Sequence, residues 1–563
     1  MTERLAVELG ALAMIVVLVA LRPRWARVAH ARLMVTLGRL ARHPVLVCLF
    51  LGVGTAGIAA IHATLVHWPE PSIHDEFAYL LGAETFAGGE LTRPTHAHWQ
   101  HFETLHVLQT PTYAPKYPPG QSLALASGKV LTGEVRAGLW LEAGGMVAAI
   151  VWMLFQWLPG RWAVLGGVII ALQLGVRGPW VQTFYGGSLA ALGGALMLGA
   201  VPGILQRRSM AASLVMAAGL SVLAVTRPFE GLVASLPVAV VLAASLLRAR
   251  GEELREFLIR VAAPITVVLA ATLVGIGAHN SAVTGDSMRL PYVEYDAQYS
   301  VYPPFLWQPV APEPEYRIAR IRDFMVGSQV GSHAVPHEPA ALAKLSGRRI
   351  FQLLAGLLGS VLIVPLVLAA FASLVRVARR GPREPARRAL LLPLAVAAAV
   401  GLASCVTTFA APRYAAPALG ALMVLLMVGW KSLTTRPRRH RARAAALSIG
   451  VLLALGITTA DRGSKRWLGG ERYLGHVRST IQDSLRASPG RDLVLVRVLS
   501  SDAIHQEFVF NDADIDASEI VWAHELAPEM NEALLRYFPD RVVWLLVVES
   551  VLEDRWTIDR LER

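Results

Sequence analysis

Residues 44–66 read PVLVCLFLGVGTAGIAAIHATLV and contain no Asp, Glu, Lys or Arg. An apolar run of this length suits an α-helix that crosses the hydrocarbon layer of a membrane, about 30 Å thick. Comparable runs recur along the chain and predict a multi-spanning α-helical protein with about twelve transmembrane helices. The expected spans are 5–21, 44–66, 135–158, 162–177, 186–205, 210–226, 229–247, 259–279, 350–375, 389–410, 414–433 and 444–460.

The composition of the 563 residues agrees with a membrane protein. Hydrophobic residues make up 54% of the chain and charged residues only 17%, and the mean hydropathy is +0.47. Soluble proteins carry about 25% charged residues, so a purely cytosolic or secreted enzyme is excluded. Both cysteines, Cys48 and Cys405, lie inside apolar runs, which excludes a disulfide framework and a cysteine-based metal site.

The net charge of +12 comes from basic residues that lie mostly between the apolar runs. This distribution indicates contact with membrane lipids and no nucleic-acid partner. The clusters occupy every second connection, at 22–42, 207–208, 248–260, 376–388 and 431–443. The positive-inside rule makes these connections cytoplasmic and places the long loops 67–134 and 280–349 on the outer face.

After residue 460 the apolar runs shorten to strand length. Three of them, Leu493–Val498, Ile520–Trp522 and Val542–Val548, surround a helical stretch near Pro528–Tyr537. We therefore expect two parts: a transmembrane domain over 1–460 and a small α/β domain over 461–563 on the outer face.

The first outer loop opens with His74-Asp75-Glu76-Phe77-Ala78-Tyr79, directly after a predicted span. An acidic pair at the membrane surface is costly to desolvate and therefore marks a candidate functional site. The alternative is that Asp75 and Glu76 only cap the helix that begins there, because acids stabilise helix N-termini.

Several short motifs along residues 40–435 together resemble a known family. They are Asp75-Glu76-x-x-Tyr79, Gly89-Glu90-Leu91, Lys116-Tyr117-Pro118-Pro119, Phe184-Tyr185-Gly186-Gly187, Thr226-Arg227-Pro228, Pro291-Tyr292 and Arg413-Tyr414-x-x-Pro417. In their order and membrane placement these motifs resemble the GT-C membrane glycosyltransferases. The pattern is similar to bacterial members of glycosyltransferase family 39, which are related to protein mannosyltransferases and to the aminoarabinose transferase of lipid A.

The resemblance implies transfer of a sugar from a polyprenyl-phosphate carrier to a lipid, polysaccharide or protein acceptor at the outer face of a bacterial cytoplasmic membrane. Inverting transfer needs a carboxylate base, for which Asp75 is the first candidate and Glu76 the second. Lys116, Arg227 and Arg413 are candidates for holding the departing phosphate. Each of the two arginines has an alternative role, since it could also anchor a span by snorkelling.

Sugar recognition uses aromatic faces beside carboxylates. The predicted sugar- and acceptor-binding residues are Tyr79, Tyr117, Tyr292, Glu294 and Asp296. An aromatic belt at the membrane interface explains the tyrosines equally well.

Four histidines in the first outer loop are candidate metal ligands: His96, His98, His101 and His106. Their spacing matches no His-x-x-x-His pair on a helix face, so no metal site is predicted. The resemblance leaves a divalent ion held by carboxylates open, but we expect no cofactor.

Two other functions compete with the enzyme. A transporter or lipid flippase has a similar number of spans, but usually carries paired halves and charges inside its spans, whereas here the charges concentrate in outer loops. A non-catalytic membrane scaffold is the other alternative.

Overall fold

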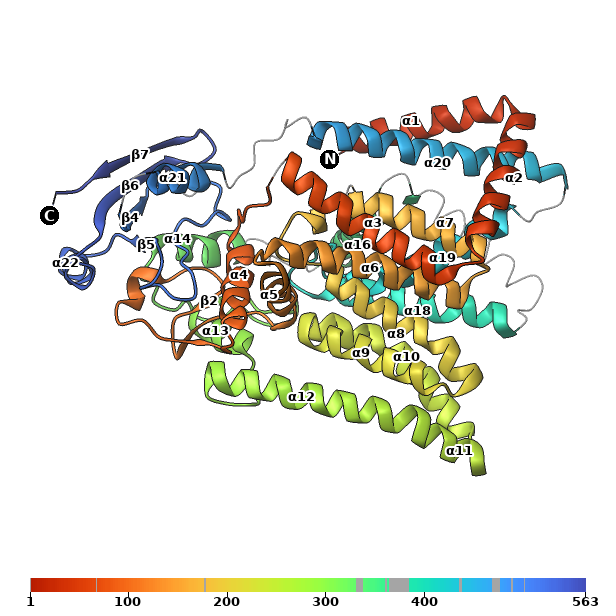
Figure 1. The fold of residues 1–563 in the computed structure, drawn as a ribbon, viewed down its shortest axis with the longest axis horizontal. Coiled ribbons are helices and arrows are strands. Elements are labelled where there is room, and N and C mark those ends of the chain that lie inside the picture. The colour runs from red at the N-terminus through yellow and green to blue at the C-terminus, as the bar shows by residue number, and fades with distance from the viewer. Residues whose placement is uncertain are drawn as a thin grey trace.

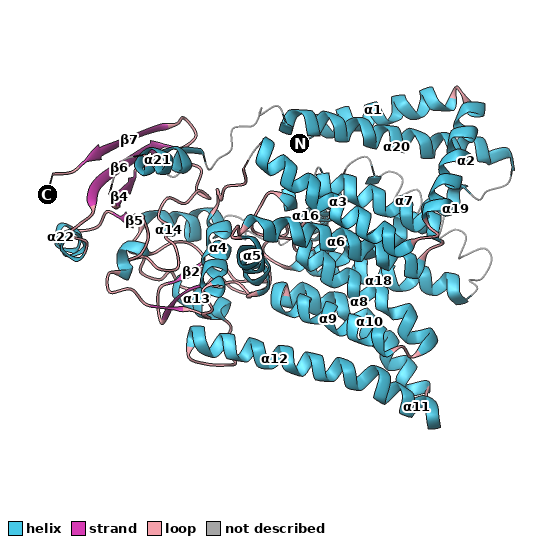
Figure 2. Ribbon diagram, in the orientation of Figure 1, coloured by secondary structure: helices cyan, strands magenta, loops and turns pink. Residues whose placement is uncertain are grey.

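The computed structural model describes residues 2–66, 68–176, 179–330, 338–359, 362–363, 384–434, 438–467, 476–487, 490–500 and 502–562. A bundle of long helices forms most of the molecule, and an end of mixed helices and strands extends from it (Figures 1 and 2). The C-terminal strands and the loops after α3 and α12 lie together at this end.

Apolar runs become the helices of the bundle because a helix satisfies its own backbone hydrogen bonds in a medium without water. The bundle contains α1 (Thr2–Ala20), α2 (Pro23–Leu40), α3 (Pro44–Leu65), α6 (Arg136–Trp157), α7 (Gly160–Ile170), α8 (Ser188–Arg207), α9 (Met210–Thr226), α10 (Pro228–Arg248), α11 (Gly251–Phe257), α12 (Ala263–Thr284), α16 (Pro339–Leu358), α18 (Glu384–Val406), α19 (Leu419–Thr434) and α20 (Arg438–Trp467).

Among the described residues, five helical stretches are long and apolar enough to cross a membrane. They are Pro44–Leu65, Arg136–Trp157, Ser188–Arg207, Pro228–Arg248 and Gly251–Thr284, and five shorter apolar helices accompany them. The membrane architecture agrees with the sequence prediction, while the count of twelve spans is not reached. Much of the expected span 350–375 and part of the basic cluster 376–388 lie outside the described residues.

The basic stretch 22–42, predicted as a connection, is instead largely the helix α2. Its Arg, Ala and Leu residues have high helix propensity, and Pro23 occupies the first turn, where its missing N–H costs nothing. The basic charge of the stretch alone therefore did not indicate that the connection is helical.

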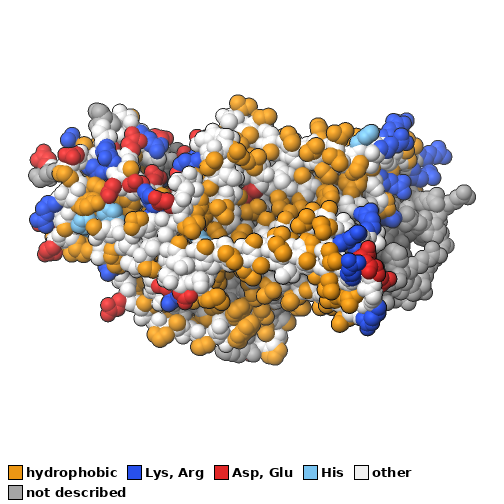
Figure 3. Space-filling model, turned by 60° about the horizontal axis from the view of Figure 1, so that its bottom comes forward, with side chains coloured by type: hydrophobic (Ala, Val, Ile, Leu, Met, Phe, Trp, Pro, Cys, Tyr) orange, Lys and Arg blue, Asp and Glu red, His pale blue; other side chains and the backbone are white. Residues whose placement is uncertain are grey.

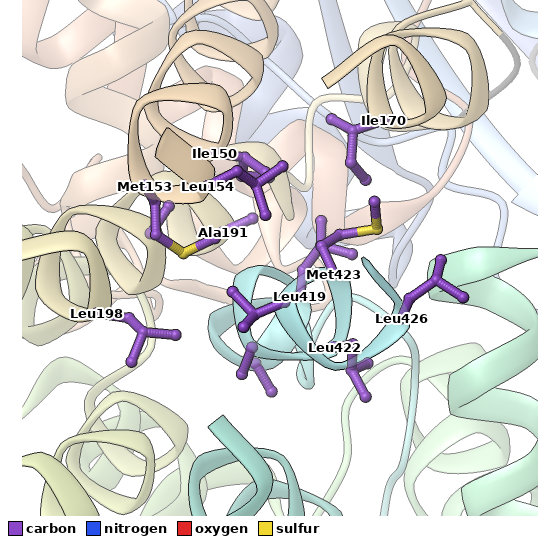
Figure 4. Packing of buried hydrophobic residues seen from close by; sticks show 14 of the residues in the cluster. Ile150, Met153, Leu154, Ile170, Ala191, Leu198, Leu419, Leu422, Met423 and Leu426 are labelled. Atoms are coloured by element: carbon purple, nitrogen blue, oxygen red, sulfur yellow. The ribbon is translucent and has the colours of Figure 1, made fainter. Parts of the chain in front are cut away.

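Helices α6, α8 and α19 form the centre of the bundle. Ile150 and Met153 of α6 point toward Leu419 and Met423 of α19, with Ala191 of α8 beside them (Figure 4). These five side chains are fully buried, each 0% exposed.

The end of the molecule that bears the C-terminal strands also carries short elements that follow the spans. They are α4 (His74–Ala87), β1 (Arg93–Pro94), a 3-10 turn at Trp99–Phe102, β2 (Val107–Leu108), β3 (Thr112–Pro115), α5 (Gly120–Thr132), α13 (Pro291–Tyr299), α14 (Ala319–Arg322) and a π-helical turn at Asp323–Gln329. The three strands form an antiparallel sheet of order β1-β3-β2.

The C-terminal residues form a sheet of order β5-β4-β6-β7. Its strands are β4 (Asp492–Val498), β5 (Ile520–His524), β6 (Val542–Ser550) and β7 (Arg555–Arg560), and its helices are α21 (His476–Arg486) and α22 (Pro528–Tyr537). The first three strands are parallel and coincide with the predicted apolar runs. Strand β7 is antiparallel at the edge, and its polar sequence RWTIDR carries no apolar signal.

The distribution of side chains along the molecule is that of a membrane protein. Hydrophobic side chains cover the middle, basic ones gather at the end that bears α11, and mixed charges cover the opposite end (Figure 3). Arg248, Arg250, Arg255 and Arg260 are among the basic residues of this stretch around α11. The C-terminal sheet and the long loops are thus remote from this basic end.

Candidate active site at the outer end of the bundle

Asp75 lies in the first turn of α4, which begins soon after α3 leaves the bundle. Its side chain is 14% exposed. Four side chains contact the carboxylate, those of His74, His106, Tyr117 and Arg413, and its two oxygens have different neighbours.

Oxygen Oδ1 is in contact with Tyr117 and Arg413. The Tyr117 hydroxyl donates a hydrogen bond of 2.7 Å to it, and a terminal nitrogen of Arg413 lies 3.6 Å away. Tyr117 is fixed by the ring of Tyr79, which stacks on it with centroids 4.5 Å apart.

Oxygen Oδ2 faces two imidazoles. His74 Nδ1 lies 3.3 Å from it and His106 Nε2 lies 4.0 Å from it. His106 has a backbone φ of 68°, which a residue with a Cβ rarely adopts. The Tyr295 hydroxyl accepts a hydrogen bond from the His106 amide and helps to hold this conformation.

The surroundings keep Asp75 ionised. Burial alone would raise the pKa of its carboxyl, but the contact from His74, with smaller effects of the neighbouring His106 imidazole and the Arg413 guanidinium, outweighs burial and holds the pKa well below its usual value. Burial and the nearby charge of Lys116 lower the pKa of His106 well below its usual value, so this imidazole is neutral at pH 7. A neutral imidazole and an ionised carboxylate therefore face each other.

Lys116 is 1% exposed and lies among aromatic rings. Its ammonium is 4.5 Å from the centroid of Tyr292 and 4.4 Å from that of Tyr295. Burial raises the pKa of Asp296 to about 6, and Lys116 opposes this shift. The cation is thus held by ring faces, with Asp296 close enough to interact through charge.

Arg413 and Arg227 share one aromatic ring. The guanidinium carbon of Arg413 lies 5.2 Å, and that of Arg227 4.6 Å, from the centroid of Tyr414. Arg413 also lies 4.4 Å from the ring of Tyr185. The three predicted cations therefore gather around the region of Asp75, although they come from distant parts of the sequence.

Glu76 is tied to backbone. Its Oε2 accepts hydrogen bonds from the amide and hydroxyl of Ser72, at 2.9 and 3.1 Å, and its Oε1 accepts one of 3.0 Å from the Phe184 amide. Glu76 thus caps α4, as the alternative interpretation of the acidic pair expects, and also joins α4 to the segment that carries Tyr185.

Glu294 contacts residues near it in the sequence. Its carboxylate contacts Arg289 at 2.7 Å and accepts a 2.7 Å hydrogen bond from Gln298. Of the predicted sugar- and acceptor-binding residues, Tyr79, Tyr117 and Tyr292 lie in the aromatic surroundings of Asp75 and Lys116, and Asp296 lies near Lys116.

Sequence reasoning missed His74 and His505. His74 Nε2 lies 3.2 Å from His505 Nδ1, so the C-terminal domain reaches the surroundings of Asp75. His74 stands next to Asp75 in the sequence, a signal that could have been used. His505 lies 430 positions from Asp75, and only the fold brings it there.

The other loop histidines serve the contact with the C-terminal domain. His96 Nε2 lies 3.1 Å from Asp516, and His101 Nδ1 lies 2.8 Å from the carbonyl of His524. His98 packs against the ring of Tyr537. His96, His98 and His101 therefore contact the C-terminal domain. Of the four histidines, His106 alone reaches Asp75.

Within the described part of the chain, His74, Asp75 and His106 are the group whose ligand atoms are close enough to surround a metal ion, all within 4.8 Å of one another. The charges around this trio oppose a dication, because Arg413 contacts its carboxylate and Lys116 lies near His106.

A cleft of about 510 Å³ lies elsewhere, between the membrane part and the C-terminal domain. Phe77 and Glu84 of α4 line it together with Trp68, Arg136 and Arg478. At 100° per residue these two α4 positions point away from Asp75, so the cleft and the Asp75 cluster lie on opposite sides of α4.

No protein-family model and no curated protein matches the chain. Sixteen chains of solved structures do. ArnT from Cupriavidus metallidurans, bound to undecaprenyl phosphate, is 14% identical, with a TM-score of 0.49 over 88% of this chain and 92% of that one. The Archaeoglobus fulgidus oligosaccharyltransferase AglB, in complex with an inhibitory peptide and a dolichol-phosphate, is 12% identical, with a TM-score of 0.46 over 89% and 69%.

Both neighbours belong to the GT-C superfamily, which the sequence motifs resemble. The same oligosaccharyltransferase tethered with an acceptor peptide is 11% identical, with a TM-score of 0.43 over 88% of this chain and 69% of that one. All three TM-scores lie below 0.5.

Proposed function

We propose that this protein transfers a sugar from a polyprenyl-phosphate carrier to an acceptor hydroxyl, with inversion at the anomeric carbon and with Asp75 as the general base. The observation that carries the proposal is an ionised carboxylate, Asp75, set among Lys116, Arg227 and Arg413 at the end of an apolar bundle. More cations than ionised acids gather there, which favours an anionic ligand.

The chemistry follows from this charge pattern. The acceptor oxygen attacks the anomeric carbon while the bond from that carbon to the phosphate oxygen breaks, and the lipid phosphate leaves with the bonding electron pair. Asp75 takes the proton of the acceptor hydroxyl. Arg413, Lys116 and Arg227 stabilise the charge that develops on the phosphate, and their partial burial strengthens this interaction.

The position of the site suits a lipid-borne donor. The prenyl chain can remain beside the apolar helices while its phosphate reaches the loops that carry Asp75 and Lys116. We place the site and the C-terminal domain on the outer face of a bacterial cytoplasmic membrane, because basic side chains gather at the opposite end of the bundle. The acceptor is of lipid, polysaccharide or protein class.

The two competing functions fit the arrangement less well. A transporter binds its substrate near the midplane, between spans, whereas the Asp75 cluster is built from loops at one end of the bundle. Burying an ionised carboxylate among several cations costs desolvation energy. A non-catalytic scaffold would gain nothing from this arrangement.

The test is turnover of radiolabelled polyprenyl-phosphate sugars by the full chain in liposomes. Asp75→Asn is expected to lower kcat by about two to four orders of magnitude while donor binding persists, because the amide cannot take the proton. Glu76→Gln keeps the acceptor atom for the Phe184 amide and is expected to cost less. Full activity of Asp75→Asn would refute the base assignment.

A further inference from the structure

His505 belongs to the C-terminal domain, and yet it contacts the residue that precedes the proposed base. Its Nδ1 lies 3.2 Å from His74 Nε2, and its carbonyl accepts a 3.2 Å hydrogen bond from the His74 amide. The next residue, Gln506, forms an isolated antiparallel bridge with Ile73. The loop around His505 is therefore joined to the start of α4 through backbone and side chain.

This loop is held firmly by the rest of the molecule. Arg320 of α14 donates hydrogen bonds of 2.9 Å to the carbonyls of both Ser500 and Ala503. Asp502 accepts a 2.7 Å hydrogen bond from the Ser550 hydroxyl at the end of β6. Ala503 has a φ of 45°, a conformation that costs energy for a residue with a Cβ and persists where the surroundings impose it.

The ring of His74 is enclosed on several sides. Phe324 meets it edge to face with centroids 4.7 Å apart, His106 does so at 4.4 Å, and His505 lies at 5.3 Å. His74 is 2% exposed, whereas His505 is exposed. His74 therefore has little freedom except rotation of its own ring and the choice of which nitrogen carries the proton.

The two contacts of His74 determine that choice. An ionised carboxylate can only accept hydrogen bonds, so the nitrogen of His74 that faces Asp75, Nδ1 at 3.3 Å from Oδ2, is the one that must carry a proton for the two groups to attract. Nitrogen Nε2 is then an acceptor, and the group that can donate to it is the N–H on His505 Nδ1. A partner of this kind fixes the tautomer and the orientation of a functional imidazole.

We infer that His505 is a positioning residue of the active site: its Nδ1–H holds His74 in the tautomer and orientation that direct Nδ1–H of His74 at Asp75. The C-terminal domain thereby takes part in aligning the base. This inference rests on the proposed function, since it assigns His505 a role in the same sugar transfer.

The experiment compares His505→Ala with His505→Asn in the full chain in liposomes. Asn places an amide N–H close to where the imidazole Nδ1–H lies, whereas Ala removes the donor. We expect His505→Ala to lower kcat about tenfold with little change in KM, and His505→Asn to restore most of the activity. His98→Ala is the matched control, because His98 lies on the docking surface of the same domain, against Tyr537, and not at Asp75.

A double-mutant cycle gives a second measurement. If His505 acts through His74, adding His505→Ala to His74→Ala lowers kcat no further, whereas independent effects would multiply. Equal activity of His505→Ala and the wild type would overturn the inference, and so would an equal loss in the Ala and Asn variants or a change confined to KM. A loss caused by chelator and reversed by zinc would also overturn it and make the cluster a metal site.

Failure of the inference is distinguishable from failure of the proposed function. A fully active Asp75→Asn variant refutes the base, whatever His505 does. An inactive Asp75→Asn beside a fully active His505→Ala leaves the base in place and refutes the positioning role alone.

Discussion

At the scale of single residues, the site depends on the imbalance of charge around Asp75. Burial raises the pKa of the Asp75 carboxyl, whose side chain is 14% exposed, yet the contact from His74, with smaller effects of His106 and Arg413, holds this pKa well below its usual value. A carboxylate that stays ionised so readily is a weak base toward a hydroxyl, so in the proposed reaction we expect proton transfer to coincide with departure of the phosphate. We therefore expect the cations and the carboxylate to act in one step.

We expect Arg413 to interact both with the Asp75 carboxylate and with the departing phosphate. Arg413→Ala should lower donor affinity or turnover by about ten- to a thousand-fold, because it removes a cation from the phosphate site. The same change should move the acid limb of the kcat/KM profile to higher pH. The sign follows from Asp75: its lowered pKa keeps the base ionised in mildly acidic solution, and loss of Arg413 lets burial raise that pKa.

The measurement is donor binding and the pH profile of turnover for the wild type, Arg413→Ala and Arg413→Lys. The lysine variant keeps the charge and should retain part of the activity. Unchanged binding and an unchanged acid limb in Arg413→Ala would show that Arg413 only anchors its span at the interface.

Chelation tests the expectation that no cofactor is needed. Arg413 already contacts the carboxylate of the His74, Asp75 and His106 trio, and Lys116 adds a second positive charge nearby. We therefore expect turnover in liposomes to persist after EDTA treatment. Loss of turnover that returns with a divalent ion would contradict this expectation.

At the scale of elements, the segment Phe184–Gly187 connects α4 to the cation site. Glu76 holds its first amide, Tyr185 lies under Arg413, and Gly187 packs on the ring of Trp180. A Cβ on Gly187 would lie 2.5 Å from that ring, at a φ of 152°. Gly186 has a φ of 65°, and a Cβ on it would clash with Gln121 Oε1, so both consecutive positions of this motif need a glycine.

Gly187→Ala is expected to lower the free energy of unfolding by about 1–3 kcal/mol and to reduce turnover through displacement of Tyr185. Thermal unfolding in detergent and turnover in liposomes measure the two effects. Gly54→Ala in α3 is the control, because nothing lies within 4 Å of its added Cβ, and it should leave both quantities nearly unchanged. Equal behaviour of the two variants would contradict the packing argument.

Sequence patterns predicted the elements that a single run determines. Apolar length located most bundle helices, and short apolar runs located β4, β5 and β6. The motifs also predicted that Asp75, Lys116 and Arg413 belong to one site. The amphipathic helix α2, the polar strand β7 and the docking role of His96 and His101 were missed, because each depends on what packs against it and not on its own hydropathy.

At the scale of the whole molecule, the C-terminal domain contacts both long loops, 67–134 and 280–349. Arg93 of the first loop contacts Asp514 at 3.0 Å, and Arg320 of the second holds the loop around His505. Between the two, His524 Nε2 lies 2.8 Å from the carbonyl of Glu103. Since these contacts surround the same cluster, the domain and the Asp75 site must lie on the same side of the membrane.

Because the C-terminal domain and the Asp75 site lie on the same side of the membrane, the orientation of the chain tests the proposed function. A polyprenyl-phosphate donor used at the outer face requires the C-terminal domain to be outside and the basic connection around α11 to be inside. In a chain with Cys48 and Cys405 replaced, Leu552→Cys should react with a membrane-impermeant thiol reagent in intact cells. Glu252→Cys, exposed in α11, should react only after the membrane is opened. The reverse pattern would place Asp75 on the cytoplasmic side, where a cytosolic nucleotide-linked sugar could reach it, and the lipid-linked donor would no longer follow from the position of the site.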